Sequence, residues 1–109
     1  YHKTTDDSEL INAAGAARVR DPVWRLPFWA PYEADIEPGI ADLDNAPSGG
    51  MAGAITAALF LRRFVGEQDR YCHFDIYGWN PTAAPGRPQG GVGMGARALF
   101  EALPGVLGL

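Results

Sequence analysis

The chain has 109 residues, and its 9 basic side chains are outnumbered by 13 acidic ones, which gives a formal net charge of −4 at pH 7. This balance argues against a nucleic-acid partner, because domains that bind a phosphate backbone usually present a basic face. No apolar run approaches the roughly 20 residues that a membrane-spanning helix needs, so a membrane partner is not expected either. With 47% hydrophobic residues, the chain suits one domain or part of one.

Cys72 is the single cysteine, so no disulfide can form within the chain, as is typical of a protein of the reducing cytoplasm. A catalytic thiolate is one interpretation of Cys72, but the surrounding apolar run favours a cysteine buried in a strand. Residues 1–5 contain neither an initiator methionine nor a signal-peptide pattern. We interpret them as part of a connector within a longer protein.

The first expected element is a helix that begins at Asp6, whose carboxylate suits an N-cap with Glu9 three residues later. The helix is expected to continue through an alanine-rich stretch to Arg20. Asp21-Pro22 then interrupts it, because proline does not fit a helix interior. An aromatic connector stiffened by prolines follows, and we expect it to pack on the body of the protein.

A strand, a helix and a second strand are predicted next. Alternation over residues 40–45 predicts a short strand, the apolar run over 51–65 predicts a helix that Gly66 ends, and residues 71–77 predict another strand. This order indicates a βαβ unit, whose two strands lie parallel in one sheet. The helix is apolar on almost all sides, so most of its surface should be covered.

Residues 80–91 are rich in proline and glycine and predict a loop, and residues 92–103 predict a final helix. The apolar residues of this helix repeat at Val92, Ala96, Leu99 and Leu103. The predicted order is therefore α-β-α-β-α, in the α/β fold class. Two strands make a poor sheet alone, so residues 1–109 are expected to be part of a larger domain.

Four polar side chains on the two predicted strands are candidate metal ligands: Asp42, Asp44, His73 and Asp75. Each pair is two residues apart and lies on one face of its strand, and carboxylates with imidazole suit zinc or manganese. The alternative is that these groups hydrogen-bond loop backbone and cap helices. No third clustered ligand and no ligand-spacing signature accompanies them, which favours the alternative.

Two other motifs are better explained by structure than by chemistry. Residues 91–96 match the G-x-G-x-x-A pattern of dinucleotide-binding loops, but a loop rather than a strand precedes them, and no later strand follows. We instead expect these glycines to let the last helix approach a neighbouring backbone. Arg62-Arg63 is interpreted as the solvated end of the central helix.

Four segments, in order, resemble the C-terminal half of the leucyl (cytosol) aminopeptidase family. Residues 22–27 (PVWRLP) are similar to a W-R-[LM]-P segment of that family, 40–45 (IADLDN) to its I-A-D-[LMI]-x-N strand, and 49–61 (GGMAGAITAALFL) to its G-G-x-x-G-[AS]-I-T-A-A-x-F-L helix. Residues 73–78 (HFDIYG) correspond to its H-[LF]-D-I-x-[GA] strand, and 86–88 (GRP) with the last helix complete the pattern. The helix motif is the specific part.

The resemblance implies the C-terminal part of a three-layer α/β/α, zinc-exopeptidase-like catalytic domain. Family members are metal-dependent aminopeptidases that hydrolyse N-terminal residues from peptides, usually as cytoplasmic homohexamers. They use two divalent ions, manganese or zinc, which polarise the scissile carbonyl and lower the pKa of a bridging water. The ligand-bearing N-T-D-A-E-G-R-L motif of the family does not occur in this sequence. The resemblance therefore assigns no catalytic residue and no metal ligand to this chain, and implies that the chain is inactive alone.

One wall of the substrate pocket does carry over. The family places a small residue and, three positions later, an often apolar one against the first side chain of the substrate, and Tyr77 and Asn80 occupy these positions. They would make the pocket narrower and more polar than one built for leucine. The alternative is that Tyr77 packs in the core. For the whole chain, the alternative to an enzyme segment is a truncated, non-enzymatic relative that acts as an interaction or regulatory module.

Overall fold

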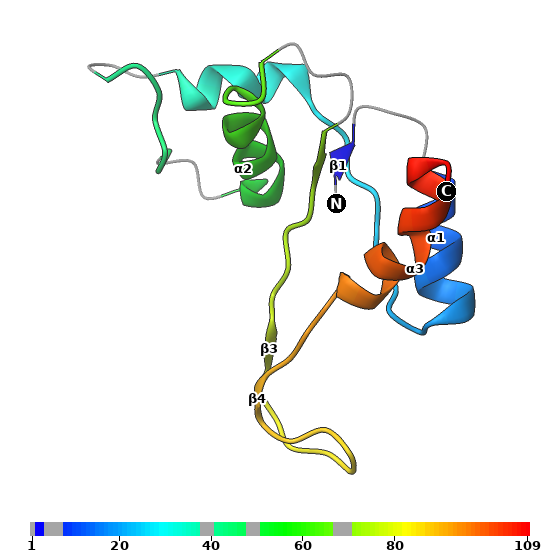
Figure 1. Cartoon of the computed structure of the whole chain (residues 1–109). Coiled ribbons are helices and arrows are strands. Elements are labelled where there is room, and N and C mark those ends of the chain that lie inside the picture. Colours follow the sequence, from blue (N-terminus) through cyan, green and yellow to red (C-terminus); the bar gives the residue numbers. More distant parts are fainter. Residues whose placement is uncertain (1, 4–7, 38–40, 48–50, 67–70) are drawn as a thin grey trace. The chain divides into compact units, whose positions relative to one another are not determined.

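The computed structural model describes residues 2–3, 8–37, 41–47, 51–66 and 71–109, as drawn in Figure 1. The chain forms two compact units: unit 1 comprises residues 1–6 and 25–75, and unit 2 comprises residues 7–24 and 76–109. Both contain helices and one short antiparallel strand pair, so the chain is of mixed α and β structure. In order, the elements are β1 (His2–Lys3), α1 (Ser8–Ala13), η1 (Ala14–Arg18), η2 (Ala30–Ile36), α2 (Gly53–Arg62), β2 (Cys72–His73), β3 (Trp79–Asn80), β4 (Gly90–Gly91) and α3 (Ala96–Leu107).

The core of unit 1 lies where helix α2 packs on the 3-10 helix η2. Three side chains are almost fully buried there: Ile36, Ala58 and Leu59. The predicted central helix is thus confirmed, although it spans Gly53–Arg62 instead of residues 51–65. Gly66 follows the turn that ends the helix and has a φ of +69°, as its predicted role requires. The helix is covered less than expected, because Leu61 stays exposed.

The strand predicted over residues 40–45 is not present in the part that the structure describes, residues 41–45, where the backbone bends. Two hydrogen bonds, both of 2.9 Å, hold this segment: the Asp44 N–H donates to the Ile36 carbonyl, and Asp44 Oδ1 accepts from the Ala46 N–H. A strand is stabilised by a ladder of bonds to its neighbour. No described segment offers residues 41–45 such a ladder.

The second predicted strand, over residues 71–77, is reduced to β2. This strand pairs antiparallel with β1, with His2 opposite His73. The expected parallel βαβ unit is therefore absent from the described residues, where both strand pairs are antiparallel. Parallel strands occur almost only in larger sheets covered on both faces, and the described ranges contain only two-stranded pairs.

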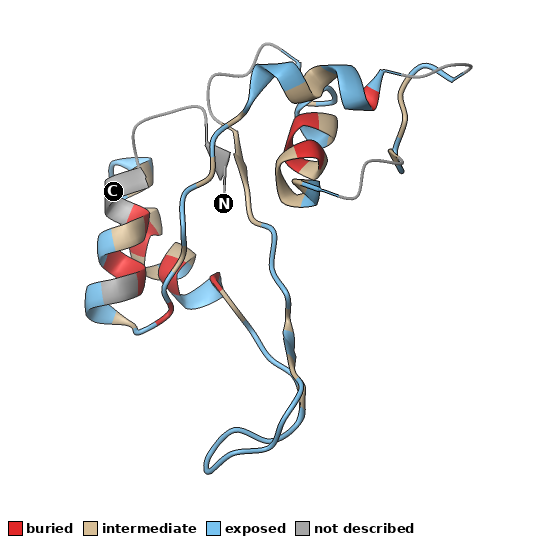
Figure 2. Cartoon of the chain, turned by 180° about the vertical axis from the view of Figure 1, so that it is seen from behind, coloured by how far each residue is buried: buried red, intermediate tan, exposed pale blue. Residues whose placement is uncertain are grey.

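The core of unit 2 lies where α1 and the π-helical turn η1 pack against α3. It consists of four buried side chains, Ile11, Ala14, Ala98 and Ala102, and Figure 2 shows the buried residues gathered on the helices. The first helical segment ends at Arg18, not at Arg20, which adopts a left-handed φ of 51°. The predicted cap at Asp6 lies outside the described residues.

The last helix is shifted along the chain from the predicted range of 92–103 to Ala96–Leu107. Val92 precedes the helix and is exposed, and the buried face carries Ala98 and Ala102 in place of the predicted repeat. The helix continues through Pro104, because a proline removes its own N–H bond to the preceding turn but does not prevent later residues from being helical. It ends at Gly108, whose φ of 72° is typical of a helix C-terminus.

Close backbone approach occurs at Gly15, whereas two of the glycines for which the sequence predicted it, Gly91 and Gly93, do not show it. A Cβ on Gly15 would lie 2.5 Å from the Asp21 carbonyl oxygen and 2.8 Å from the Ala98 Cβ. Gly91 and Gly93 would meet nothing within 4 Å, so the prediction is wrong for both. Glycine is therefore required at this position of the first helical segment, where α3 crosses it.

Residues 78–92 form a β-hairpin. Trp79 lies opposite Gly91 and Asn80 opposite Gly90, and the Val92 N–H continues the ladder by donating to the Gly78 carbonyl at 3.0 Å. The predicted loop is therefore the turn of this hairpin, and residues 81–89 are all exposed (Figure 2).

Candidate functional site

Tyr77 stands at the base of the hairpin, next to Gly78, whose carbonyl accepts the bond from Val92. Its side chain is 74% exposed. The alternative in which Tyr77 packs in the core therefore does not hold within this chain. An exposed phenol ring attached to a hydrogen-bonded strand can line a pocket, because it offers a flat apolar face and one polar tip.

Asn80 lies three residues further along the chain, in β3, and is half-buried. Its Nδ2 donates to the Arg87 carbonyl at 3.0 Å and to the Pro88 carbonyl at 2.7 Å. An amide nitrogen carries two hydrogens, so both are used within the hairpin. The structure thus places both predicted pocket residues at the hairpin, Tyr77 before β3 and Asn80 within it, but the amide nitrogen of Asn80 is directed at the backbone of the turn.

Asp21 is the residue of unit 2 whose role sequence reasoning missed. Its buried carboxylate accepts hydrogen bonds from the backbone N–H groups of Gly95, Arg97 and Ala98 at 2.9, 3.0 and 3.3 Å. The first residues of a helix have no partners for these groups within the helix, and Gly95 at the N-cap position has no side chain to supply one. Asp21 therefore caps α3 from a distant part of the chain.

The electrostatics of Asp21 follow from this geometry. Burial alone would raise the pKa of its carboxyl, but the hydrogen bonds from Gly95, Ala98 and Arg97 outweigh burial and lower the pKa below the ordinary 3.8. The Arg97 guanidinium, whose Nε lies 4.0 Å from Asp21 Oδ2, acts in the same direction. Two features of the sequence indicate such a cap: Gly95 at the start of the last helix has no side chain that could cap it, and Asp21 is an aspartate outside any helix.

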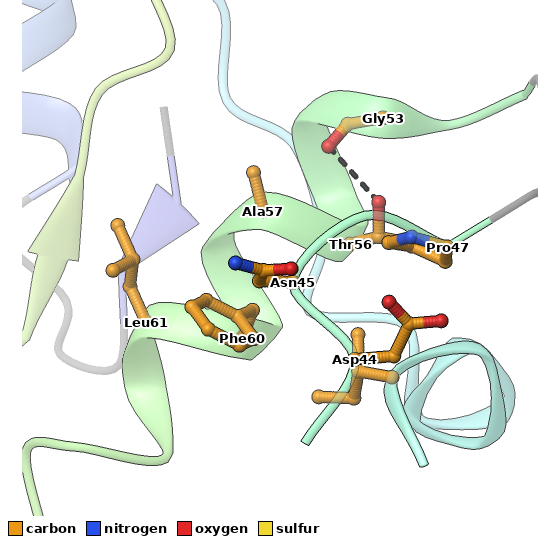
Figure 3. Close-up of a pocket in the computed structure, with 9 residues that line it drawn as sticks. Asp44, Asn45, Pro47, Gly53, Thr56, Ala57, Phe60 and Leu61 are labelled. Atoms are coloured by element: carbon orange, nitrogen blue, oxygen red, sulfur yellow. Dashed lines mark hydrogen bonds between the residues drawn. The ribbon is translucent and has the colours of Figure 1, made fainter. Parts of the chain in front are cut away.

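Unit 1 contains an open hollow of about 410 Å³ beside α2, shown in Figure 3. Its lining is mostly apolar and includes Ile36, Pro47, Ala57, Phe60 and Leu61, with Asp44, Asn45 and Thr56 as polar members. The Thr56 hydroxyl donates to the Gly53 carbonyl at 3.1 Å, and Asp44 is bonded within its own turn. Since these two polar groups are committed to local backbone, the hollow suits an apolar group better than a charged one.

The four candidate metal ligands are not assembled into a metal site. Among the described residues, no three or more His, Cys, Asp or Glu side chains are gathered as a metal ion requires. Asp42 and Asp75 are exposed, and Asp44 Oδ1 accepts the Ala46 N–H. Burial lowers the pKa of His73 below its ordinary 6.5, and the nearby Asp75 partly offsets this. The bland alternative, local hydrogen bonding, is thus seen at Asp44.

An aromatic cluster joins the connector to helix α2 in unit 1. The Arg62 guanidinium lies 5.0 Å from the centre of the Phe28 ring, and the Phe28 and Tyr71 rings are 5.9 Å apart. The Tyr71 hydroxyl donates to the Ala58 carbonyl at 3.1 Å, and burial, followed by the neighbouring Cys72, raises its pKa. The predicted packing of the connector is therefore seen at Phe28, whereas Trp24 and Trp29 are exposed. Cys72 itself is half-buried in β2.

Arg63 extends this end of the helix into an exposed ion-pair network. Its Nη2 lies 2.7 Å from Glu33 Oε2 and 2.6 Å from Glu37 Oε1. The hydrogen bonds to Glu33 and Glu37 raise the pKa of Arg63. Arg62 and Arg63 are exposed at the end of α2, as predicted, but both also have partners: Arg62 lies over the Phe28 ring, and Arg63 pairs with Glu33 and Glu37.

Comparison with known proteins identifies a family to which this chain is similar. The sequence matches the catalytic domain of the cytosol aminopeptidase family over residues 2–100. It is 43% identical to the probable cytosol aminopeptidase of Geobacter sulfurreducens over 97 residues, and 47% identical to that of Caulobacter vibrioides over 95 residues. These alignments cover 87% and 84% of this chain but 19% of either relative.

The fold has a counterpart among solved structures. The crystal structure of the cytosol aminopeptidase from Coxiella burnetii superimposes with a TM-score of 0.84 at 43% identity, covering 95% of this chain and 23% of that one. The chain therefore spans about a fifth of the length of the curated relatives it matches. None of the helices in the described ranges combines the length and hydrophobicity needed to cross a membrane.

Proposed function

The chain belongs to the cytosol aminopeptidase family, and we propose that it acts as the C-terminal segment of a metal-dependent aminopeptidase that releases N-terminal residues from peptides. The observation that carries the proposal is the family match over residues 2–100, joined to a TM-score of 0.84 with a cytosol aminopeptidase at 43% identity. The relatives are about five times longer than this chain, since it covers 19% of them. The activity is therefore assigned to the whole enzyme and not to these 109 residues.

The first role of the segment is to scaffold. Residues 41–45 have no ladder partner among the described residues, and of residues 71–77 only β2 is paired, antiparallel with β1. Parallel strands occur almost only in larger sheets covered on both faces. We propose that both become parallel strands of a three-layer α/β/α domain when the rest of the sheet is present. The exposed apolar residues of unit 1, among them Leu61 and Phe64, would then be covered.

The metal centre is assigned to residues outside this chain. Two divalent ions, manganese or zinc, would supply Lewis acidity and an activated water when bound. The residues described here do not fit such a centre, because Asp42 and Asp75 are exposed and separate and Asp44 is hydrogen-bonded to its own turn. We therefore assign no step of the reaction to them.

The second role is to form one wall of the substrate pocket through Tyr77. The 74% exposure of Tyr77 supports this role, because the ring is accessible to a peptide. A tyrosine occupies more volume than the small residue typical of the family, so the pocket would favour small N-terminal residues over leucine. Peptides are the proposed substrates, and a cytoplasmic homohexamer is the proposed setting.

Hydrolysis of aminoacyl-coumarin amides tests the enzyme assignment. The 109-residue chain, supplied with Mn²⁺ or Zn²⁺, is expected to show no turnover, whereas the complete gene product is expected to release N-terminal residues. Turnover by the 109-residue chain alone would overturn the assignment of catalysis to other residues. The ligand-bearing family motif N-T-D-A-E-G-R-L contains the pattern D-x-E-x-R. A complete gene that encodes no D-x-E-x-R sequence upstream of these residues would overturn the assignment to a metal-dependent aminopeptidase.

The alternative, a non-enzymatic interaction module, makes a different prediction. A module should be monomeric and unfold cooperatively as a 109-residue chain. An enzyme segment should associate, because the apolar side chains of α2 lack their cover. Sedimentation of the 109-residue chain over a range of concentrations separates the two.

A further inference from the structure

Few backbone hydrogen bonds close the turn of the hairpin. It contains Pro81, Pro85 and Pro88, and a proline has no backbone N–H to donate. Past the Asn80–Gly90 pair, the only described backbone bonds are the two between Ala84 and Arg87, at 2.8 and 2.9 Å. The exposed carbonyls that face across the turn therefore accept hydrogen bonds from side chains or from water.

Two side-chain amides supply these donors, one from each strand. Asn80 Nδ2 donates to the carbonyls of Arg87 and Pro88, at 3.0 and 2.7 Å. In the other direction, Gln89 Nε2 donates to the Pro81 carbonyl at 3.0 Å. The two amides thus close the turn reciprocally, directly after the last pair of the ladder.

This arrangement separates the two residues that the sequence assigned to the substrate pocket. The ring of Tyr77 is exposed, while the amide hydrogens of Asn80 are both donated to the turn. Tyr77 lies two residues before β3, which contains Asn80, and the ladder bonds run from Gly78–Val92 to Asn80–Gly90. Loosening of the turn at Asn80 would reach Tyr77 through this short ladder.

We propose that Asn80 is a positioning residue that clamps the hairpin turn and so holds Tyr77 in place, and that it does not itself contact the substrate. This inference rests on the proposed function only in giving Tyr77 a substrate to meet. Asn80 was expected to form a polar part of the pocket wall. Under this proposal Tyr77 is the only one of the two residues that contacts the substrate, and Asn80 fixes the hairpin beside it.

A double-mutant cycle in the complete enzyme tests the proposal. The variants are Tyr77→Ala, Asn80→Asp and the double variant, and the readout is the ratio of kcat/KM for alanyl and phenylalanyl coumarin amides. Asn80→Asp keeps the shape of the side chain but removes both N–H donors. It is expected to shift the ratio toward the larger residue, as Tyr77→Ala does, and to add no further shift in the double variant, because it acts only through Tyr77.

Hydrogen exchange of the hairpin provides the second arm, independent of activity. The amides of Ala84 and Arg87 are expected to exchange about tenfold faster in Asn80→Asp, since two hydrogen bonds are lost. Tyr77→Ala should leave them unchanged. Should the charge of Asn80→Asp prevent folding, Asn80→Ala removes the donors without adding a charge, and the same result is expected.

Two results would overturn the proposal. Multiplicative effects of the two substitutions on the selectivity ratio would mean that Asn80 contacts the substrate directly. Unchanged exchange in the turn of Asn80→Asp would mean that the amide is no clamp. A complete enzyme with no aminopeptidase activity would instead overturn the proposed function and the specificity role of Tyr77, while the exchange arm would still decide the clamp.

Discussion

The two units hold their main helices by different means. In unit 2, the start of α3 is capped by the buried carboxylate of Asp21, which lies 74 residues from its first partner, Gly95. In unit 1, the end of α2 is tied to η2 by Arg63, whose partners Glu33 and Glu37 are partly exposed. Hydrogen bonds to a buried charge contribute more than exposed ion pairs, which water and salt screen. The start of α3 in unit 2 therefore depends on one residue, whereas the end of α2 in unit 1 depends on a network that single changes weaken only slightly.

The largest expected effect comes from Asp21→Asn. An asparagine keeps the shape but loses the charge and one acceptor, so the backbone N–H groups of Arg97 and Ala98 lose their charged partner. Unit 2 should lose about 1.5–3 kcal/mol of stability. Amide exchange at Ala98 to Ala102 measures the loss, and Asp42→Asn, an exposed carboxylate in unit 1, is the control. Equal effects of the two substitutions would contradict the difference between the units.

A pair of glycine substitutions is expected to act in opposite directions in the two units. Gly15→Ala places a Cβ 2.5 Å from the Asp21 carbonyl oxygen, and this overpacking should destabilise unit 2 by about 1–3 kcal/mol. Gly53→Ala meets nothing within 4 Å at the start of α2, and should stabilise unit 1 by about 0.4–1 kcal/mol through the unfolded state. Urea unfolding followed by circular dichroism measures both, and a neutral Gly15→Ala would refute the close crossing.

The pH dependence of unit 2 is expected to follow Asp21. Its folded pKa lies below 3.8, so the unfolded state takes up the proton first as the pH falls. The contribution of Asp21 is thus complete above about pH 5 and is lost as the pH falls below 3.8 toward the folded pKa. The stability difference between the original chain and Asp21→Asn should shrink over this window. A difference that stays constant from pH 6 to pH 2 would contradict the cap.

The smallest effect is expected from Arg63→Gln. This substitution removes the ion pairs to Glu33 and Glu37, and its cost should be below that of Asp21→Asn. The cost should also disappear in 1 M NaCl, where the Debye length is about 3 Å. The cost of Asp21→Asn should persist in the same salt, because the carboxylate is buried. Unfolding curves with and without salt distinguish the two units directly.

The parts of the fold that were predictable are those fixed by local sequence. The central helix followed from an apolar run that ends in Arg62, and from Gly66, whose left-handed φ closes it. The break after the first helix followed from Asp21-Pro22. In each case the cause and the effect lie within a few residues of each other.

The predictions that were wrong concern features that depend on residues distant in sequence. The alternation of residues 41–45 indicates a strand, but a strand exists only where a second one supplies its hydrogen bonds. The cap at α3 could not be read from its own residues, because Gly95 has no side chain and the carboxylate comes from Asp21. Asn80 was assigned to the pocket from its position, and only the three-dimensional structure shows its amide bonded to Arg87 and Pro88.

Calorimetric titration of the 109-residue chain with Zn²⁺ or Mn²⁺ tests most directly the claim that this segment is scaffold and pocket wall, with the metal centre elsewhere. We expect no tight, stoichiometric site, because the described residues gather no three metal-binding side chains. Micromolar or tighter binding that is lost in Asp42→Ala or His73→Ala would contradict the account.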